Sequence, residues 1–226
     1  MTWFGNFYRS TIGKKAVMAV SGLILFGFVF VHMIGNLKMY LGAEHFNEYA
    51  HFLRNVGAPA VPENGVLWIA RVVLLVMAGL HVWSAWQLTQ LAWAARGTEK
   101  YRRRDFEAAD YAVRTMRWGG VIVLLFIVFH ILHLTTGQAH PSFNAENPYA
   151  NVVAGFQVPW VAAIYIVANL ALGLHLFHGV WSMFNSLGLN HERFNAWRTY
   201  FAATFALIIT LGNVSFPLAV LTGIVR

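Results

Sequence analysis

Residues 170–181 read LALGLHLFHGVW, a run of apolar side chains interrupted by His175 and His178. Three other apolar segments carry a histidine in the same way: LFGFVFVHMIGNL (25–37), VMAGLHVWSAW (76–86) and LLFIVFHILHL (124–134). Imidazole inside a lipid bilayer is costly unless something binds it, so an ionisable residue in such a segment is a candidate for function. These segments decide both the fold and the place where the chemistry lies.

The composition is that of an integral membrane protein. Hydrophobic residues make up 58% of the 226 residues and charged residues only 11%, whereas a soluble domain has about 25% charged residues. A membrane span needs about 20 apolar residues. The sequence therefore predicts an all-α membrane protein, a single domain over residues 1–226 whose five transmembrane helices form a bundle. The spans are expected at 16–37, 66–92, 118–137, 159–187 and 200–223, with a loop containing proline and asparagine over 138–158.

The distribution of lysine and arginine predicts the orientation of the bundle. Of the 16 basic residues, 12 precede the first span or lie between the second and third or the fourth and fifth spans. Short cytoplasmic segments carry such an excess. We therefore expect a cytoplasmic amino terminus and an outside carboxyl terminus, with the net charge of +7 reflecting topology rather than a nucleic-acid partner. The spacing of apolar residues in GAEHFNEYAHFLRNVG (42–57) predicts a short amphipathic helix at the outer surface.

Helix rise converts sequence position into depth. His32 and His130 are expected roughly 8–10 Å below the outer surface, and His81 and His175 roughly 22 Å below it. The histidines thus sort into an outer pair and an inner pair, separated by roughly 13 Å. Paired neutral imidazoles in a helical bundle suit haem iron. The sequence therefore predicts two stacked haems, each held by two histidines from different helices. The chain has no cysteine, which excludes disulfides, covalent haem attachment and cysteine-ligated iron–sulfur clusters in this subunit.

Other polar groups near these pairs have more than one interpretation. His133 and His178 each follow a proposed ligand by three residues. Each can replace its neighbour as ligand, donate to a propionate or quinone, or simply bond a backbone carbonyl. Ser21 is expected among the small residues on the helix face of His32. Arg71 is expected near the outer haem propionates, or else as an interfacial arginine that reaches to the membrane surface.

The chain resembles the cytochrome b membrane-anchor subunit of succinate:quinone oxidoreductases, in its five-helix, two-haem, single-anchor form. The resemblance covers essentially the whole chain. It lies in HMIGNL and GAEHFNEYAHFLR at the first span and after it, LHVWSAW in the second, RTMRWGG before the third, FHILHLTTG at its end and LHLFHGVWSMFNSLGLN in the fourth.

The resemblance implies a function and a set of partners. A flavoprotein carrying FAD and an iron–sulfur protein would bind the cytoplasmic face, in the plasma membrane of a prokaryote. Electrons would pass between the clusters, two b haems and a quinone, usually menaquinone. The implied ligands are His32 and His130 for the outer haem, and His81 and His175 for the inner haem. For the quinone, polar residues near the outer haem (His51 among them) are slightly preferred to His178 and Ser182 near the inner haem.

One departure from the family pattern bears on proton movement. Some of these anchors carry a glutamate two residues before the fourth ligand, where this chain has Gly173. Aspartate and glutamate are absent from all five predicted spans. A proton path through a bilayer needs such groups or ordered water, so we expect no carboxylate relay across this subunit.

The sequence favours an electron-transfer subunit over an independent enzyme, because it has no flavin-binding glycine motif. The basic segment 93–117 is expected to dock the iron–sulfur subunit, or else only to reflect topology. Two rivals are weighed: a di-haem anchor of another quinone-linked dehydrogenase or hydrogenase, and a haem-free transporter with proton-carrying histidines. Anchors of the first kind tend to draw more than one haem ligand from a single helix, whereas here one ligand per helix suffices. A transporter of the second kind would need repeated broken helices, which this sequence does not show. The oligomeric state of the whole complex stays open.

Overall fold

The computed structural model describes residues 3–96, 107–189, 191 and 195–226. Five helices in this part of the chain are long and apolar enough to cross a membrane, which confirms the predicted fold class. The apolar stretches run over Thr11–Leu41, Gly65–Ala95, Met116–Thr135, Pro159–Ser186 and Asn195–Leu221. The first and last begin five residues before their predicted starts, because the helices continue past the apolar core into the polar flanks. 

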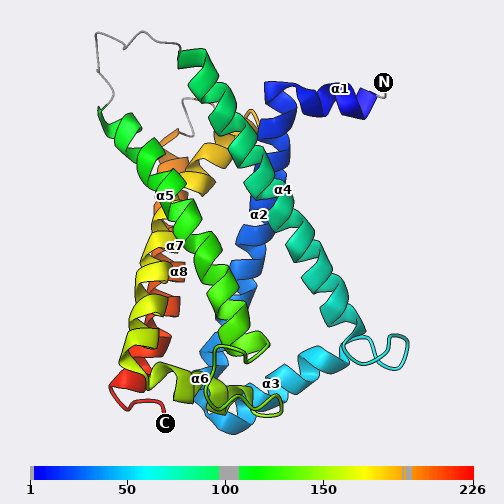
Figure 1. The fold of residues 1–226 in the computed structure, drawn as a ribbon, viewed down its shortest axis with the longest axis vertical. Helices are drawn as coiled ribbons and strands as arrows, with labels where there is room; N and C mark the ends of the chain where they lie inside the picture. The colour runs from blue at the N-terminus through cyan, green and yellow to red at the C-terminus, as the bar shows by residue number, and fades with distance from the viewer. Residues whose placement is uncertain (1–2, 97–106, 190, 192–194) are drawn as a thin grey trace.

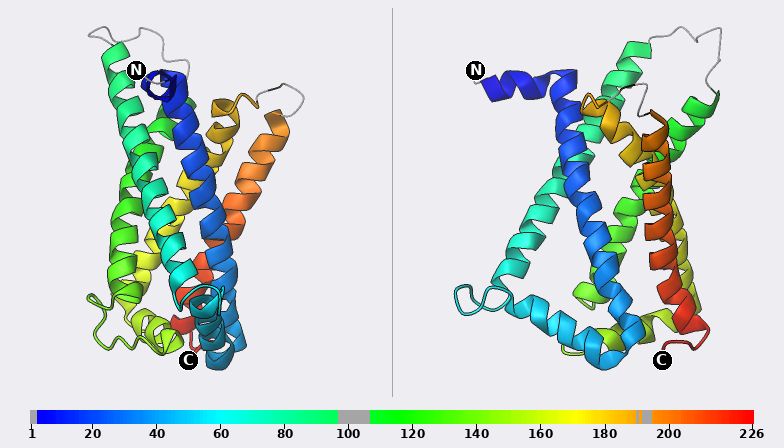
Figure 2. Two further views of the ribbon diagram at one scale, coloured as in Figure 1. Left: turned by 90° about the vertical axis from the view of Figure 1, so that its right-hand side faces the viewer. Right: turned by 180° about the vertical axis from the view of Figure 1, so that it is seen from behind.

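The spans are formed by α2 (Thr11–Asn36), α4 (Gly65–Arg96), α5 (Glu107–His130), α7 (Pro159–Ser186) and α8 (Asn195–Leu221). Figure 1 shows the amino-terminal α1 (Trp3–Arg9) and the end of α8 at opposite ends of the molecule. The closest helix contacts join α2 to α4, α5 to α7, and α7 to α8, with α2 also touching α7. Figure 1 and Figure 2 show α4 crossing α2 obliquely, so that the end of α4 next to α3 diverges from α7 and α8. 

Short helices cover one end of the bundle. The predicted amphipathic helix is present as α3 (Ala43–Asn55), preceded by a 3-10 turn over Leu37–Leu41. A second short helix, α6 (Pro148–Phe156), lies beside α3 in the segment expected to be a loop. Its start has a clear local cause: the Asn147 side chain accepts a hydrogen bond from the Ala150 amide, and proline follows at the first helical position. The expectation of a loop throughout 138–158 was therefore wrong.

The packed core lies toward the end of the bundle that α3 and α6 cover. It includes Met33 of α2, Phe156 of α6, Tyr165 of α7 and Ile209 of α8. By contrast, the most apolar window of α4 has no buried residue. An apolar helix that the protein does not bury is suited to contact lipid. His32, His81, His130 and His175 are exposed or half-buried, so they lie outside this core.

Candidate functional site

The outer histidines come together from α2 and α5. The ring centroids of His32 and His130 are 5.9 Å apart, and their planes are nearly perpendicular at 83°. Each ring has a phenylalanine beside it from one helical turn earlier: Phe28 stacks on His32 at 5.3 Å, and Phe126 lies 5.8 Å from His130. The spacing of four residues places these neighbours on one helix face.

The inner histidines come together from α4 and α7. The ring centroids of His81 and His175 are 6.2 Å apart, with an interplanar angle of 73°. The Nδ1 of His81 lies 3.1 Å from the carbonyl oxygen of Met18 and 3.5 Å from the hydroxyl of Ser21. With the Nδ1 proton donated to the carbonyl, the lone pair of Nε2 is free to bind a metal.

Both pairs bridge helices that do not pack closely. Neither α2 with α5 nor α4 with α7 belongs to the close contacts of the described residues, although their histidine rings approach each other. Two imidazoles on opposite faces of one metal ion, with nitrogen–metal bonds of about 2.0–2.1 Å, would have their centroids about 6.4 Å apart. The observed separations of 5.9 and 6.2 Å are close to this value.

Glycines leave room beside the inner pair. A Cβ atom on Gly22 would lie 3.1 Å from Cε1 of His81, and one on Gly120 would lie 3.4 Å from Cε1 of His175. Ser21, which was expected on the helix face of His32, and Gly22 both adjoin the ring of His81, because α2 packs along α4. Ser21 is almost fully buried, and its hydroxyl donates to the Val17 carbonyl at 2.7 Å.

The donor set fits haem iron. Among the described residues, no three His, Cys, Asp or Glu side chains gather around a common point. Two histidines alone make an incomplete metal site, whereas a porphyrin supplies the four remaining ligands of a six-coordinate iron. The pairing of the rings, their separation and the glycines beside the inner pair fit such a group.

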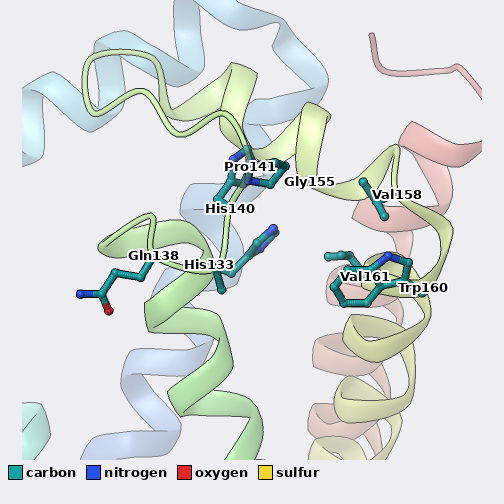
Figure 3. A pocket seen from close by; sticks show the side chains of 9 residues that line it. His133, Gln138, His140, Pro141, Gly155, Val158, Trp160 and Val161 are labelled. Carbon is teal, nitrogen blue, oxygen red and sulfur yellow. The ribbon is translucent and has the colours of Figure 1, made fainter.

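A cavity of about 500 Å³ lies near the outer pair, at the end of α5. Its lining includes His133, His140, Gly155, Trp160 and Val161, together with Gln138, Ala139, Pro141 and Val158. Figure 3 shows the imidazole of His133 pointing toward the space between His140 and Gly155 on one side and Val158, Trp160 and Val161 on the other. The Nε2 of His133 is buried without a hydrogen-bond partner. 

The histidine nitrogens around this cavity differ in whether they have a hydrogen-bond partner. His140 is fully paired: its Nε2 donates to the Asn151 carbonyl at 2.9 Å, and its Nδ1 accepts from the Ser142 amide at 3.1 Å. The Nδ1 of His133 is paired with the Tyr165 hydroxyl at 3.0 Å. Of the two histidines in this lining, His133 is the one with an unpaired nitrogen, and its Nε2 is buried beside Gly155.

Residues 99–214, just over half of the 226-residue chain, match the model of a protein family described as the succinate dehydrogenase/fumarate reductase transmembrane subunit. The chain belongs to this family. No curated protein and no solved structure matched it. As a transmembrane subunit of succinate dehydrogenase or fumarate reductase, it associates with the other subunits of that complex. The matched segment contains one histidine of each pair, His130 and His175.

The remaining residues predicted for the site of this transmembrane subunit are dispersed. Arg71 is exposed, with its guanidinium 5.0 Å from the ring centre of Trp68. His51 is exposed on α3 and pairs with Asn55, 3.1 Å away. His178 is half-buried beside Phe177, and Ser182 is half-buried one turn further along α7. Within the predicted docking segment 93–117, residues 97–106 lie outside the described part of the chain.

Sequence reasoning missed the aromatic and polar groups that surround His133 in this subunit. Tyr165 is 4% exposed and contacts both His130 and His133 through its hydroxyl. It is the one hydroxyl-bearing side chain in the apolar run 159–168, and that isolation was the available signal. His140 and Trp160 lie in or next to the segment expected to be a loop, so nothing in their spacing indicated a common cavity.

Proposed function

We propose that this transmembrane subunit is a di-haem cytochrome b anchor that passes electrons between the iron–sulfur subunit and a membrane quinone. The observation that carries the proposal is the presence of two opposed histidine pairs, each drawn from two helices and each at the spacing of a bis-histidine iron site. The partners on the cytoplasmic face are the FAD flavoprotein and the iron–sulfur protein. The membrane is the plasma membrane of a prokaryote.

The four histidines would hold the haems as His32 with His130 and His81 with His175. Haem held by two histidines would supply a one-electron carrier, which would suit electron relay rather than oxygen chemistry. The chain contributes orientation: the Met18 carbonyl fixes the ring of His81 through Nδ1, and this kind of partner also raises the basicity of a ligating imidazole. Lipid and apolar side chains exclude water from both pairs.

We place the quinone in the cavity at the end of α5. The cavity is on the side of the outer pair, it has an apolar and aromatic lining, and His133 offers an unpaired nitrogen within it. Ligand sites of this kind combine hydrophobic walls with few polar groups. His51 is not among the lining residues, so the preferred outer site shifts from His51 to His133. Menaquinone is the proposed quinone.

Replacing one inner histidine tests the electron-transfer role in the assembled complex. His175→Ala is expected to abolish succinate-dependent reduction of a membrane quinone while sparing succinate oxidation by a soluble dye, because the flavoprotein would be intact and the path through the anchor broken. His178→Ala, three residues away on the same helix, is the matched control and should retain quinone reduction. Equal quinone reduction in the His175→Ala complex and the wild type would contradict the proposal.

A further inference from the structure

The hydroxyl of Tyr165 lies between two histidines that serve different parts of the proposed site. Its oxygen is 3.2 Å from Nδ1 of His130 and 3.0 Å from Nδ1 of His133. Tyr165 is 4% exposed and His133 is 1% exposed, so water does not compete for these contacts. A phenol has one O–H to donate and lone pairs with which to accept. It can therefore accept from one imidazole while it donates to the other.

Packing holds the phenol in this place. The ring of Tyr165 makes edge contacts with Phe126 at 5.0 Å and Phe156 at 4.8 Å. On the other side, His133 stacks on Phe129 at 5.4 Å, with nearly parallel planes. His133 lies in a π-helical turn over Ile131–Thr135, which follows directly after His130. Such single π turns often occur at functional sites.

The direction of the hydrogen bonds follows from the proposed ligation of His130. A neutral imidazole that binds iron through Nε2 carries its proton on Nδ1, so His130 donates to the Tyr165 oxygen. The phenol proton is then free to donate to Nδ1 of His133. A neutral His133 that accepts at Nδ1 must carry its own proton on Nε2. That nitrogen has no partner in the protein and adjoins the cavity.

We infer that Tyr165 is a positioning residue that joins the outer haem ligand to the quinone cavity by one directed chain, His130 to Tyr165 to His133. The chain fixes the tautomers of both histidines and presents a donor at His133 Nε2 to a quinone carbonyl oxygen. It also gives the Nδ1–H of His130 an acceptor, which raises the ligand's basicity and favours ferric iron. The inference rests on the proposed function.

Tyr165→Phe tests the chain because it removes the hydroxyl and keeps the ring that packs against Phe126 and Phe156. Tyr149→Phe is the matched control, since the Tyr149 hydroxyl donates to the Arg226 carbonyl at the same end of the molecule. Both variants are made in the intact complex. The readouts are a potentiometric titration of the haem absorbance, and the KM for quinone with succinate as reductant.

In the Tyr165→Phe complex, one haem transition should move to higher potential while the other stays in place. The quinone KM should rise roughly three- to ten-fold, the ratio that one lost hydrogen bond gives, with the rate toward a soluble dye unchanged. Tyr149→Phe should match the wild type. Two unmoved transitions, a common shift of both, or an unchanged KM would overturn the inference.

Two further results distinguish a failure of this inference from a failure of the proposed function on which it rests. A wild-type complex without two b-haem transitions would refute the proposed function itself. Should the Tyr165→Phe complex not assemble, His133→Phe tests the same chain from the cavity end, because phenylalanine preserves the stack on Phe129. That variant should keep both haems and raise the quinone KM to a similar extent, and an unchanged KM would contradict the chain.

Discussion

Single histidines carry most of the functional information in this chain, because an imidazole among hydrocarbon costs free energy unless something binds it. The structure adds what the sequence left open, which is the partner of each ring. His32 approaches His130, and His81 approaches His175. Depth calculated from helix rise predicted the same grouping, although ligation itself stays a prediction. Ser21 and Gly22 show the limit of reasoning from one helix, since their neighbour His81 belongs to another.

A substitution at Gly22 tests whether the space beside His81 is needed to hold haem. Gly22→Val is expected to lower the content of inner haem, because its Cβ alone would lie 3.1 Å from Cε1 of His81 and the branches would press on the ring. Gly27→Val on the same helix is the control, as a Cβ there meets nothing within 4 Å. Haem per polypeptide in the purified complex is the measurement. Equal haem content in the two variants would show that Gly22 provides no necessary room.

At the scale of elements, the five spans were predictable because each is longer than a core helix and uniformly apolar. The short helices were harder. The apolar spacing of 42–57 indicated α3, whereas α6 depends on a cap at Asn147 and on contacts with α3 that no local pattern reveals. The cavity near His133 was not predictable either, since its walls come from the π-helical turn after α5, the loop that follows it, α6 and the start of α7.

The contact between α7 and α8 gives a prediction at this scale. Gly173 lies against Thr210, and a Cβ at position 173 would collide with the Thr210 hydroxyl. Gly173→Ala should therefore lower the stability of the complex by about 1–3 kcal/mol through overpacking. Gly179→Ala, where a Cβ meets nothing within 4 Å, should leave the stability unchanged or slightly higher. Thermal inactivation in detergent compares the two, and equal midpoints would exclude a tight contact at Gly173.

The same collision bears on the family members that carry a glutamate at the position of Gly173. In this chain such a side chain would meet α8 directly. The structure thus gives a steric reason, beside the sequence, to expect that a carboxylate has no room there.

In the whole molecule, each proposed haem would join two groups of helices. One group is formed by α2 and α4, and the other by α5, α7 and α8. Close contact between the groups runs mainly through α2, which touches α7 and α8. Where helices of the two groups do not touch, the space between them has to be filled, and two haems would fill it. The positive-inside distribution predicts which end faces the cytoplasm, and α1 and the end of α8 lie at opposite ends of the molecule, as five spans require.

The composition of the spans predicts how protons reach the quinone. None of the five apolar stretches contains Asp or Glu, so we expect no carboxylate path through the bilayer. In proteoliposomes that contain the complex, turnover should release protons where succinate is oxidised and take up an equal number next to the quinone site, with no proton crossing the bilayer through this subunit. A transmembrane proton current coupled to turnover would contradict this expectation. The same vesicles treated with a protonophore are the control.

The central claim is that the chain holds two haems, each between two histidines. The most direct test is the haem content of the purified complex, by reduced-minus-oxidised spectroscopy combined with electron paramagnetic resonance of the oxidised form. We predict two b haems per transmembrane subunit, both low-spin with two imidazole ligands. A single haem, no b-type α-band, or a high-spin signal from an open coordination site would contradict it.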